Sequence, residues 1–212
     1  VRFAGKAAEL PELPRDTIEK DLEGKFVMPG MTETHAHLSF ADASPFAIGE
    51  TLVEEATLTA VRNARLMLGS GFTSAVSFGS TYKIDVALRE AILQGTVIGP
   101  RLLAAGRDLG ATASNVDSGG GLSQIADGPW ALRKAVREQR KIGVDVVKIF
   151  IDGEAINKQN PPGELSFTDE EVLATVEEAH RRKMRVACHA RSAAAVKQAV
   201  KAGVDFIGHA NY

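Results

Sequence analysis

Short apolar segments alternate with longer amphipathic segments along most of the chain. The apolar segments have the length and composition of buried strands, whereas the amphipathic segments repeat apolar residues every three or four positions, as helices do. Strict alternation of strand and helix is typical of parallel βαβ units, whose sheet is covered by helices. The pattern predicts strands within residues 27–38, 72–78, 101–105, 144–151, 185–190 and 204–209, and helices at 50–68, 84–93, 130–142, from Thr168 onwards, and at 192–202.

The connections between these elements differ in length according to their direction. Long connections follow strands (38–50, 107–128, 152–167), and short connections marked by glycine precede strands (69–71, 143, 203). In (β/α) barrels the long loops gather at the carboxyl ends of the strands, where the active site lies. We therefore expect any site in this chain to lie at that end of the sheet.

Composition and charge exclude several classes of function. The 212 residues are 44% hydrophobic and 25% charged, with a formal net charge of -2, so neither nucleic acid nor an anionic membrane is an expected partner. The sequence has no run of 18 apolar residues and no export signal at its start, which predicts a cytoplasmic protein. The single cysteine, Cys188, is expected to be a packed core thiol that points away from the face carrying His189.

Four of the five histidines lie at the ends of predicted strands. His35 and His37 are spaced by one residue, so their side chains project from the same face of an extended strand. His189 and His209 each end a later strand, whereas His180 lies in a polar helical stretch and is expected to be a solvated surface residue. Packing does not readily explain three strand ends that terminate in histidine, but convergence on one metal site does.

A lysine interrupts the apolar fourth strand. Lys148 could lie at a sheet edge with its ammonium group in water. If the strand is instead in the middle of a parallel sheet, burial lowers the pKa of the lysine and favours the neutral, nucleophilic amine. Such an amine can take up carbon dioxide to form a carbamate, a bidentate anion that can bridge two metal ions about 3.5–4 Å apart.

Together these residues resemble those of the metal-dependent amidohydrolase superfamily, with His-x-His on the first strand, lysine on the fourth, and histidine on the fifth and sixth. Residues 22–31 (LEGKFVMPGM) resemble the passage from a small β-sandwich into the barrel of these enzymes. Residues 147–150 (VKIF), 188–193 (CHARSA) and 202–210 (AGVDFIGHA) resemble the imidazolonepropionase-like and prolidase-like branch. The resemblance implies an α/β fold of the (β/α)8 TIM-barrel type, with only the first six strands present.

The resemblance also implies roles for individual residues. His35 and His37 would bind one metal ion, His189 and His209 a second, and carboxylated Lys148 would bridge the two. Zinc is the expected ion, although another divalent metal would also suit these ligands. A metal-bound hydroxide would cleave an amide, peptide-like or cyclic amide C–N bond, as in a dipeptidase or carboxypeptidase. Arg191 could pair with a carboxylate of the small-molecule substrate, or it could be an exposed arginine that caps a loop.

The chain departs from the family pattern in two places. Glu33 stands where the family usually has aspartate, a change of length but not of charge. No counterpart of the eighth-strand aspartate, which binds metal and shuttles a proton in the family, follows the sixth strand. We therefore expect residues 1–28 to be a remnant of the β-sandwich, residues 29–212 to be a partial barrel, and the C-terminal remainder of the barrel to come from the same longer protein or a second chain. The edges of an incomplete sheet favour pairing with those missing segments or association into a homo-oligomer.

Two alternatives to a binuclear hydrolase remain open from the sequence. One is a mononuclear, deaminase-type amidohydrolase in which Lys148 is unmodified. The other is an inactive barrel fragment that binds metal without turnover, which the missing aspartate suggests. The substrate depends on the loops at 107–128 and 152–167, whose polar residues include Asp108, Asp152 and Glu154 and whose composition does not identify a ligand.

Overall fold

The computed structural model describes residues 2–41, 48, 50–117, 121–154 and 160–211. Its strands form two parallel sheets, one in the order β1-β2-β3 and the other in the order β5-β4-β6-β7-β8. The strands are β1 (Met31–Ala36), β2 (Phe72–Ser77), β3 (Arg101–Leu103), β4 (Asp108–Gly110), β5 (Ser123–Ile125), β6 (Val146–Phe150), β7 (Arg185–Ala190) and β8 (Phe206–His209).

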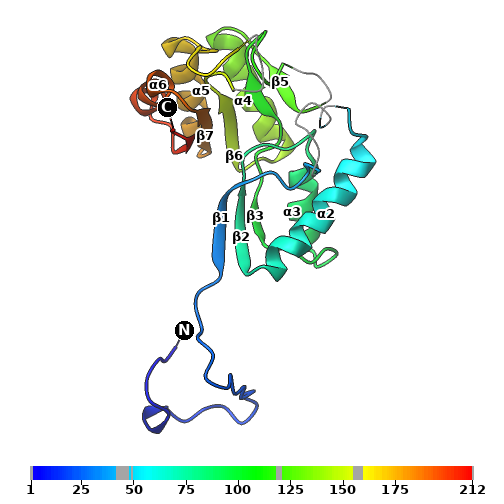
Figure 1. The fold of residues 1–212 in the computed structure, drawn as a ribbon, viewed down its shortest axis with the longest axis vertical. Helices are drawn as coiled ribbons and strands as arrows, with labels where there is room; N and C mark the ends of the chain where they lie inside the picture. The colour runs from blue at the N-terminus through cyan, green and yellow to red at the C-terminus, as the bar shows by residue number, and fades with distance from the viewer. Residues whose placement is uncertain (1, 42–47, 49, 118–120, 155–159, 212) are drawn as a thin grey trace.

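The two sheets meet where β3 ends and β6 begins. The backbone N–H groups of Asp145 and Val146 both donate to the carbonyl oxygen of Ala104, at 2.7 and 3.1 Å. A small apolar cluster, formed by Val76, Phe78, Val146 and Ala187, also contacts both sheets. The chain therefore curves as one continuous wall of parallel strands, as Figure 1 shows.

Helices cover the outer face of this wall (Figure 1). They are α2 (Val53–Gly69), α3 (Ile84–Leu93), α4 (Pro129–Ile142), α5 (Asp169–Arg181) and α6 (Ala193–Ala202). The helix ends follow local rules, since Thr168 and Glu171 form a capping box at the start of α5 and Gly143 and Gly203 take left-handed conformations after α4 and α6. No helix in the described ranges is long and apolar enough to cross a membrane.

Alternation along the strands separates the helix-facing side from the concave side. In β6 and β7 the residues Val147, Ile149, Val186 and Cys188 belong to the large core beneath the helices. Their neighbours Lys148 and His189 therefore point to the opposite side. Cys188 is fully buried, which confirms the prediction of a core thiol that points away from the face of His189.

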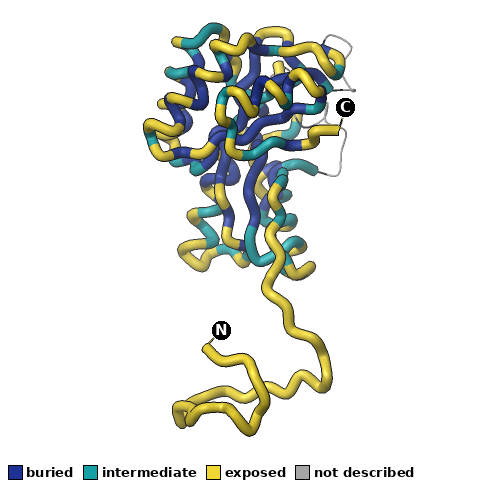
Figure 2. Tube along the Cα trace, turned by 90° about the vertical axis from the view of Figure 1, so that its left-hand side faces the viewer, coloured by how far each residue is buried: buried dark blue, intermediate teal, exposed yellow. Residues whose placement is uncertain are grey.

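The N-terminal segment is separate from this body. Residues 2–30 contain one 3-10 turn (Ala7–Glu9) and no strand, and they are exposed throughout. Figures 1 and 2 show this segment extending away from the strands. The membership of residues 1–28 in a β-sandwich stays a prediction.

The first strand, Met31–Ala36, lies within the predicted stretch 27–38 and begins where the chain first pairs with β2. One sequence prediction about the strands was wrong. Residues 107–128 are not a structureless loop, because β4 and β5 pair within them. These strands have only three residues each and lack an apolar run, so the pattern could not indicate them. Parts of the long connections, residues 42–47, 118–120 and 155–159, lie outside the described residues.

Candidate metal centre

The structure brings four of the five histidines together at the carboxyl ends of β1, β7 and β8. The ring centroids of His35 and His37 are 5.2 Å apart, those of His35 and His209 are 4.8 Å apart, and those of His189 and His209 are 4.5 Å apart. The carboxyl ends of parallel strands share one edge, so residues far apart in sequence meet there. His180 lies elsewhere, on α5, with its side chain 43% exposed and paired with Asp205, as predicted for a surface residue.

Aromatic rings and backbone groups orient these imidazoles. His35 stacks on Phe78, His37 on Phe40 and His189 on Phe150, with ring centroids 4.1, 4.5 and 3.8 Å apart. His37 Nδ1 lies 3.1 Å from the carbonyl oxygen of Gly79. Because a carbonyl only accepts, Nδ1 carries the proton and Nε2 keeps its lone pair.

Gly208 in β8 allows His35 to approach the neighbouring sheet. A Cβ atom at this position would lie 2.9 Å from Cε1 of His35 and 3.1 Å from its Nδ1. Gly208 therefore permits the close approach between β1 and β8 on which the histidine cluster depends.

Lys148 lies beneath the histidines and is only 2% exposed. Its Nζ donates a hydrogen bond of 3.1 Å to the carbonyl oxygen of Phe78 and lies 5.1 and 5.4 Å from the ring centroids of Phe78 and Phe150. Burial lowers the pKa of the lysine, and the nearby carboxylate of Asp108 only partly opposes this effect. The strand position is therefore interior and not at a sheet edge.

The histidines are held in their neutral form. Burial, reinforced by Lys148, lowers the pKa of His35 to about 3, of His37 to about 4 and of His189 to about 2. Burial also lowers the pKa of His209. Neutral imidazoles offer lone pairs at neutral pH, which is the state that binds a metal ion.

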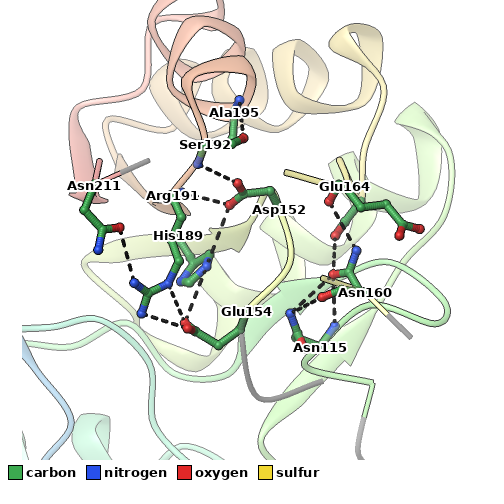
Figure 3. Close-up of polar contacts among 11 residues, drawn as sticks. Asn115, Asp152, Glu154, Asn160, Glu164, His189, Arg191, Ser192, Ala195 and Asn211 are labelled. Carbon is green, nitrogen blue, oxygen red and sulfur yellow. Dashed lines mark hydrogen bonds and ion pairs between the residues drawn. The ribbon is translucent and has the colours of Figure 1, made fainter. Parts of the chain in front are cut away.

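Two carboxylates next to β6, Asp152 and Glu154, complete the cluster (Figure 3), although the sequence pattern does not distinguish them from ordinary loop residues. Asp152 is fully buried and accepts hydrogen bonds from the backbone N–H groups of Arg191 and Ser192, at 2.9 and 2.8 Å. Carboxylate oxygens of Asp152 and Glu154 each lie 3.7 Å from Nε2 of His189. The one sequence signal for them is their position directly after the strand that carries Lys148. Their loop neighbours Asn157 and Lys158 lie outside the described residues.

The residues present fit a divalent metal ion. Nε2 of His189 is buried and has no hydrogen-bond partner, so its lone pair is unused. One ligand atom each from Glu154, His189 and His209 lie within 4.8 Å of one another. Imidazole nitrogen with carboxylate oxygen is a ligand set that zinc and similar ions favour.

Arg191 lies at the edge of this cluster and is mostly buried, with its side chain 19% exposed. Its Nε and Nη2 each contact Glu154 at 2.8 Å, and its Nη1 donates to Asn211 at 3.2 Å (Figure 3). The predicted alternative of an arginine exposed on a loop does not describe this geometry.

The curved wall of parallel strands, with helices outside and a histidine–lysine cluster at the carboxyl ends, defines a partial (β/α)8 barrel of the TIM type. A model of the amidohydrolase family matches residues 26–212, so the chain belongs to the amidohydrolase family. This confirms the predicted family and fold class.

Known relatives agree with this assignment. The chain is 27% identical to ochratoxinase from Aspergillus niger over 237 residues, an alignment that includes 100% of this chain and 49% of ochratoxinase. A crystal structure of a prolidase complexed with N-methylphosphonate-L-proline is 28% identical with a TM-score of 0.84, over 93% of this chain and 51% of that one. A Xaa-Pro dipeptidase with bound methionine in its active site is 31% identical with a TM-score of 0.75, over 84% of this chain and 47% of that one. The chain thus spans about half the length of these relatives.

Proposed function

We propose that this chain carries the metal-binding part of a hydrolase that cleaves amide, peptide-like or cyclic amide C–N bonds. The observation that carries the proposal is the convergence of four neutral histidines around a buried lysine at the carboxyl ends of the strands. The ochratoxinase, prolidase and Xaa-Pro dipeptidase relatives support hydrolysis of this class of bond.

In this proposal His35 and His37 hold one zinc ion, and His189 and His209 hold a second. When bound, zinc supplies an activated water and polarises the carbonyl group of the substrate. Burial holds the imidazoles neutral, Gly79 orients His37, and aromatic stacking orients His35 and His189.

As a carbamate, Lys148 would be the ligand shared by the two metal ions. Its neutral Nζ forms a bond to the carbon of carbon dioxide, and the proton lost from nitrogen passes to solvent. Burial favours the neutral amine that this step needs. The product is an anion among neutral imidazoles, where two cations would balance its charge.

Arg191 is proposed to bind a substrate carboxylate. The ligands in the prolidase and dipeptidase structures, a proline derivative and methionine, are amino-acid compounds with a carboxylate. Nη1 of Arg191 faces Asn211 at 3.2 Å, a contact that a substrate carboxylate could replace.

A metal-dependence experiment tests the function. The purified protein, loaded with zinc, is assayed for release of amino acid from N-acyl amino acids and Xaa-Pro dipeptides. We expect 1,10-phenanthroline to abolish hydrolysis and added zinc to restore it. Lys148→Ala should lower kcat/KM by about 100-fold or more, because metal-site ligands supply several kcal/mol of transition-state stabilisation. His180→Ala, outside the cluster, is the control that retains activity.

Hydrolysis that survives both the chelator and the Lys148→Ala substitution would refute the proposal. The zinc content per chain separates the binuclear form from the mononuclear alternative. The binuclear form predicts two equivalents of zinc, whereas one equivalent with unmodified Lys148 would indicate the mononuclear alternative. Two tightly bound zinc ions without turnover of any amide would instead indicate the inactive metal-binding form.

A further inference from the structure

We propose that Glu154 is a protein ligand of the metal ion held by His189 and His209, in addition to the bridging Lys148 of the proposed function. The inference deepens the proposed function and rests on its assignment of metal to these two histidines. It gives a role to a carboxylate that neither the histidine pattern nor the lysine indicates.

Distances place the Glu154 carboxylate where a ligand would be. Its Oε2 lies 3.7 Å from Nε2 of His189, too far for a hydrogen bond. Two ligand atoms that share a tetrahedral zinc at about 2.0–2.2 Å lie roughly 3.3–3.6 Å apart. Because His209 offers a third ligand atom within 4.8 Å of the other two, small side-chain rotations would bring all three onto one ion.

His189 supplies an independent observation that a ligand belongs here. The side chain is 1% exposed, and its Nε2 has no hydrogen-bond partner. An unsatisfied buried nitrogen costs about 1–3 kcal/mol, so natural proteins pair such atoms with a protein group, water or an ion. A cation next to His189 would satisfy this nitrogen.

Arg191 acts as a positioning residue for Glu154. Its guanidinium contacts both carboxylate oxygens at 2.8 Å, and its own backbone N–H is fixed by Asp152 at 2.9 Å. The two contacts hold the carboxylate where its Oε2 lies 3.7 Å from Nε2 of His189.

Calorimetric titration of the metal-free chain with zinc tests the inference without any activity measurement. We expect Glu154→Gln to weaken zinc binding at one of the sites by at least about 10–100-fold, because even residues that only support a ligand have effects of that size. Glu154→Asp, which keeps the carboxylate on a shorter side chain, should show a smaller loss. The matched control is Glu164→Gln, an exposed glutamate from the same connection, which should bind zinc as the unsubstituted chain does.

Thermal unfolding of each metal-free variant establishes that the variant is folded. If Glu154→Gln does not fold, the zinc affinity of Glu154→Asp is the test. Arg191→Gln removes the ion pair but keeps the carboxylate, so it should weaken zinc binding less than Glu154→Gln does. Equal zinc affinity in Glu154→Gln and Glu164→Gln would overturn the inference, as would a complete lack of zinc binding by the unsubstituted chain.

The inference and the proposed function can fail separately. Zinc binding that depends on Glu154, without hydrolysis of any amide, would support the inference and contradict the function. Zinc-dependent hydrolysis with unchanged zinc affinity in Glu154→Gln would contradict the inference and leave the function standing.

Discussion

At the scale of single residues, Gly79 connects the candidate metal centre to the interior of the barrel. Its carbonyl oxygen fixes the ring of His37, and its φ of 128° is a conformation that residues with a side chain rarely adopt. A Cβ atom here would lie 2.2 Å from Oδ1 of Asp108, a carboxylate that is 3% exposed and whose Oδ1 has no hydrogen-bond partner. Because Asp108 is buried, its carboxylate has little room to move, and the same burial raises its pKa to about 6.

We therefore predict that Gly79→Ala destabilises the fold and weakens zinc binding together. Backbone strain of about 1–3 kcal/mol and a steric cost of similar size should lower the free energy of unfolding by roughly 2–5 kcal/mol, measured by urea denaturation. Gly69→Ala is the control, because Gly69 lies at the end of α2 and a Cβ there would meet nothing within 4 Å. The control should be neutral or more stable by up to about 1 kcal/mol. Equal stability of the two variants would contradict the prediction.

The sequence could indicate only those site residues whose type is rare at their position in the predicted secondary structure. Histidines at strand ends and a lysine within an apolar strand are conspicuous, and the structure brings all five together. Asp152, Glu154 and Asp108 belong to a residue type that is common in solvated loops, and only their burial distinguishes them. Burial is a property of the tertiary fold, so no local pattern could have identified these carboxylates.

At the scale of elements, α4 and α5 are joined by an ionic cluster centred on Glu178. The glutamate side chain is fully buried, and it accepts hydrogen bonds from Nε of Arg137 and of Arg182 at 2.9 and 2.7 Å. The hydrogen bond from Arg137 is the main cause that lowers the pKa of Glu178 from 4.5 to about 2, and burial opposes it. Since the folded pKa lies below the unfolded value, the ionised group stabilises the fold above pH 4.5, and this stabilisation is lost as the pH falls toward 2.

Glu178→Gln should accordingly lower the free energy of unfolding by about 1–3 kcal/mol at pH 7, because two guanidinium groups lose a charged partner. The difference from the unsubstituted chain should shrink as the pH falls from 4.5 to 2. Denaturant unfolding at pH 7 and pH 3 measures both effects. Glu177→Gln is the matched control, since Glu177 is 49% exposed and its pair with Arg133 should contribute less than about 1 kcal/mol. A difference that persists unchanged at pH 3 would argue against this origin.

Element positions were predictable to the extent that a local pattern specifies them. The helix at residues 84–93 and the strand at 185–190 were predicted and found with the same bounds, because apolar periodicity and flanking glycine or polar residues mark both. The strands β4 and β5 were missed, since each depends on pairing with a neighbour and not on its own composition. Short strands of this kind can be inferred only after the sheet around them is known.

At the scale of the whole molecule, the candidate metal centre lies across the junction of the two sheets. His35 lies in β1 of the three-stranded sheet and His37 directly follows that strand, whereas His189 and His209 belong to β7 and β8 in the five-stranded sheet. Lys148, on β6, contributes to the lowered pKa of histidines from both pairs. Metal ions that use both pairs, with the lysine between them, would therefore tie the two sheets together.

Zinc should for this reason raise the unfolding temperature of the entire chain. A ligand at about 100 times its Kd adds about 2.7 kcal/mol of stability, which corresponds to roughly 5–10 °C for a protein of this size. If the ions join the sheets, His37→Ala and His209→Ala should each reduce this zinc-induced shift, and the double variant should abolish it. His180→Ala should keep the full shift, because His180 lies outside the cluster. Differential scanning calorimetry with and without zinc measures these shifts.

If His37→Ala left the zinc-induced shift intact while His209→Ala removed it, the metal would stabilise only the five-stranded sheet, and the bridging arrangement would be wrong.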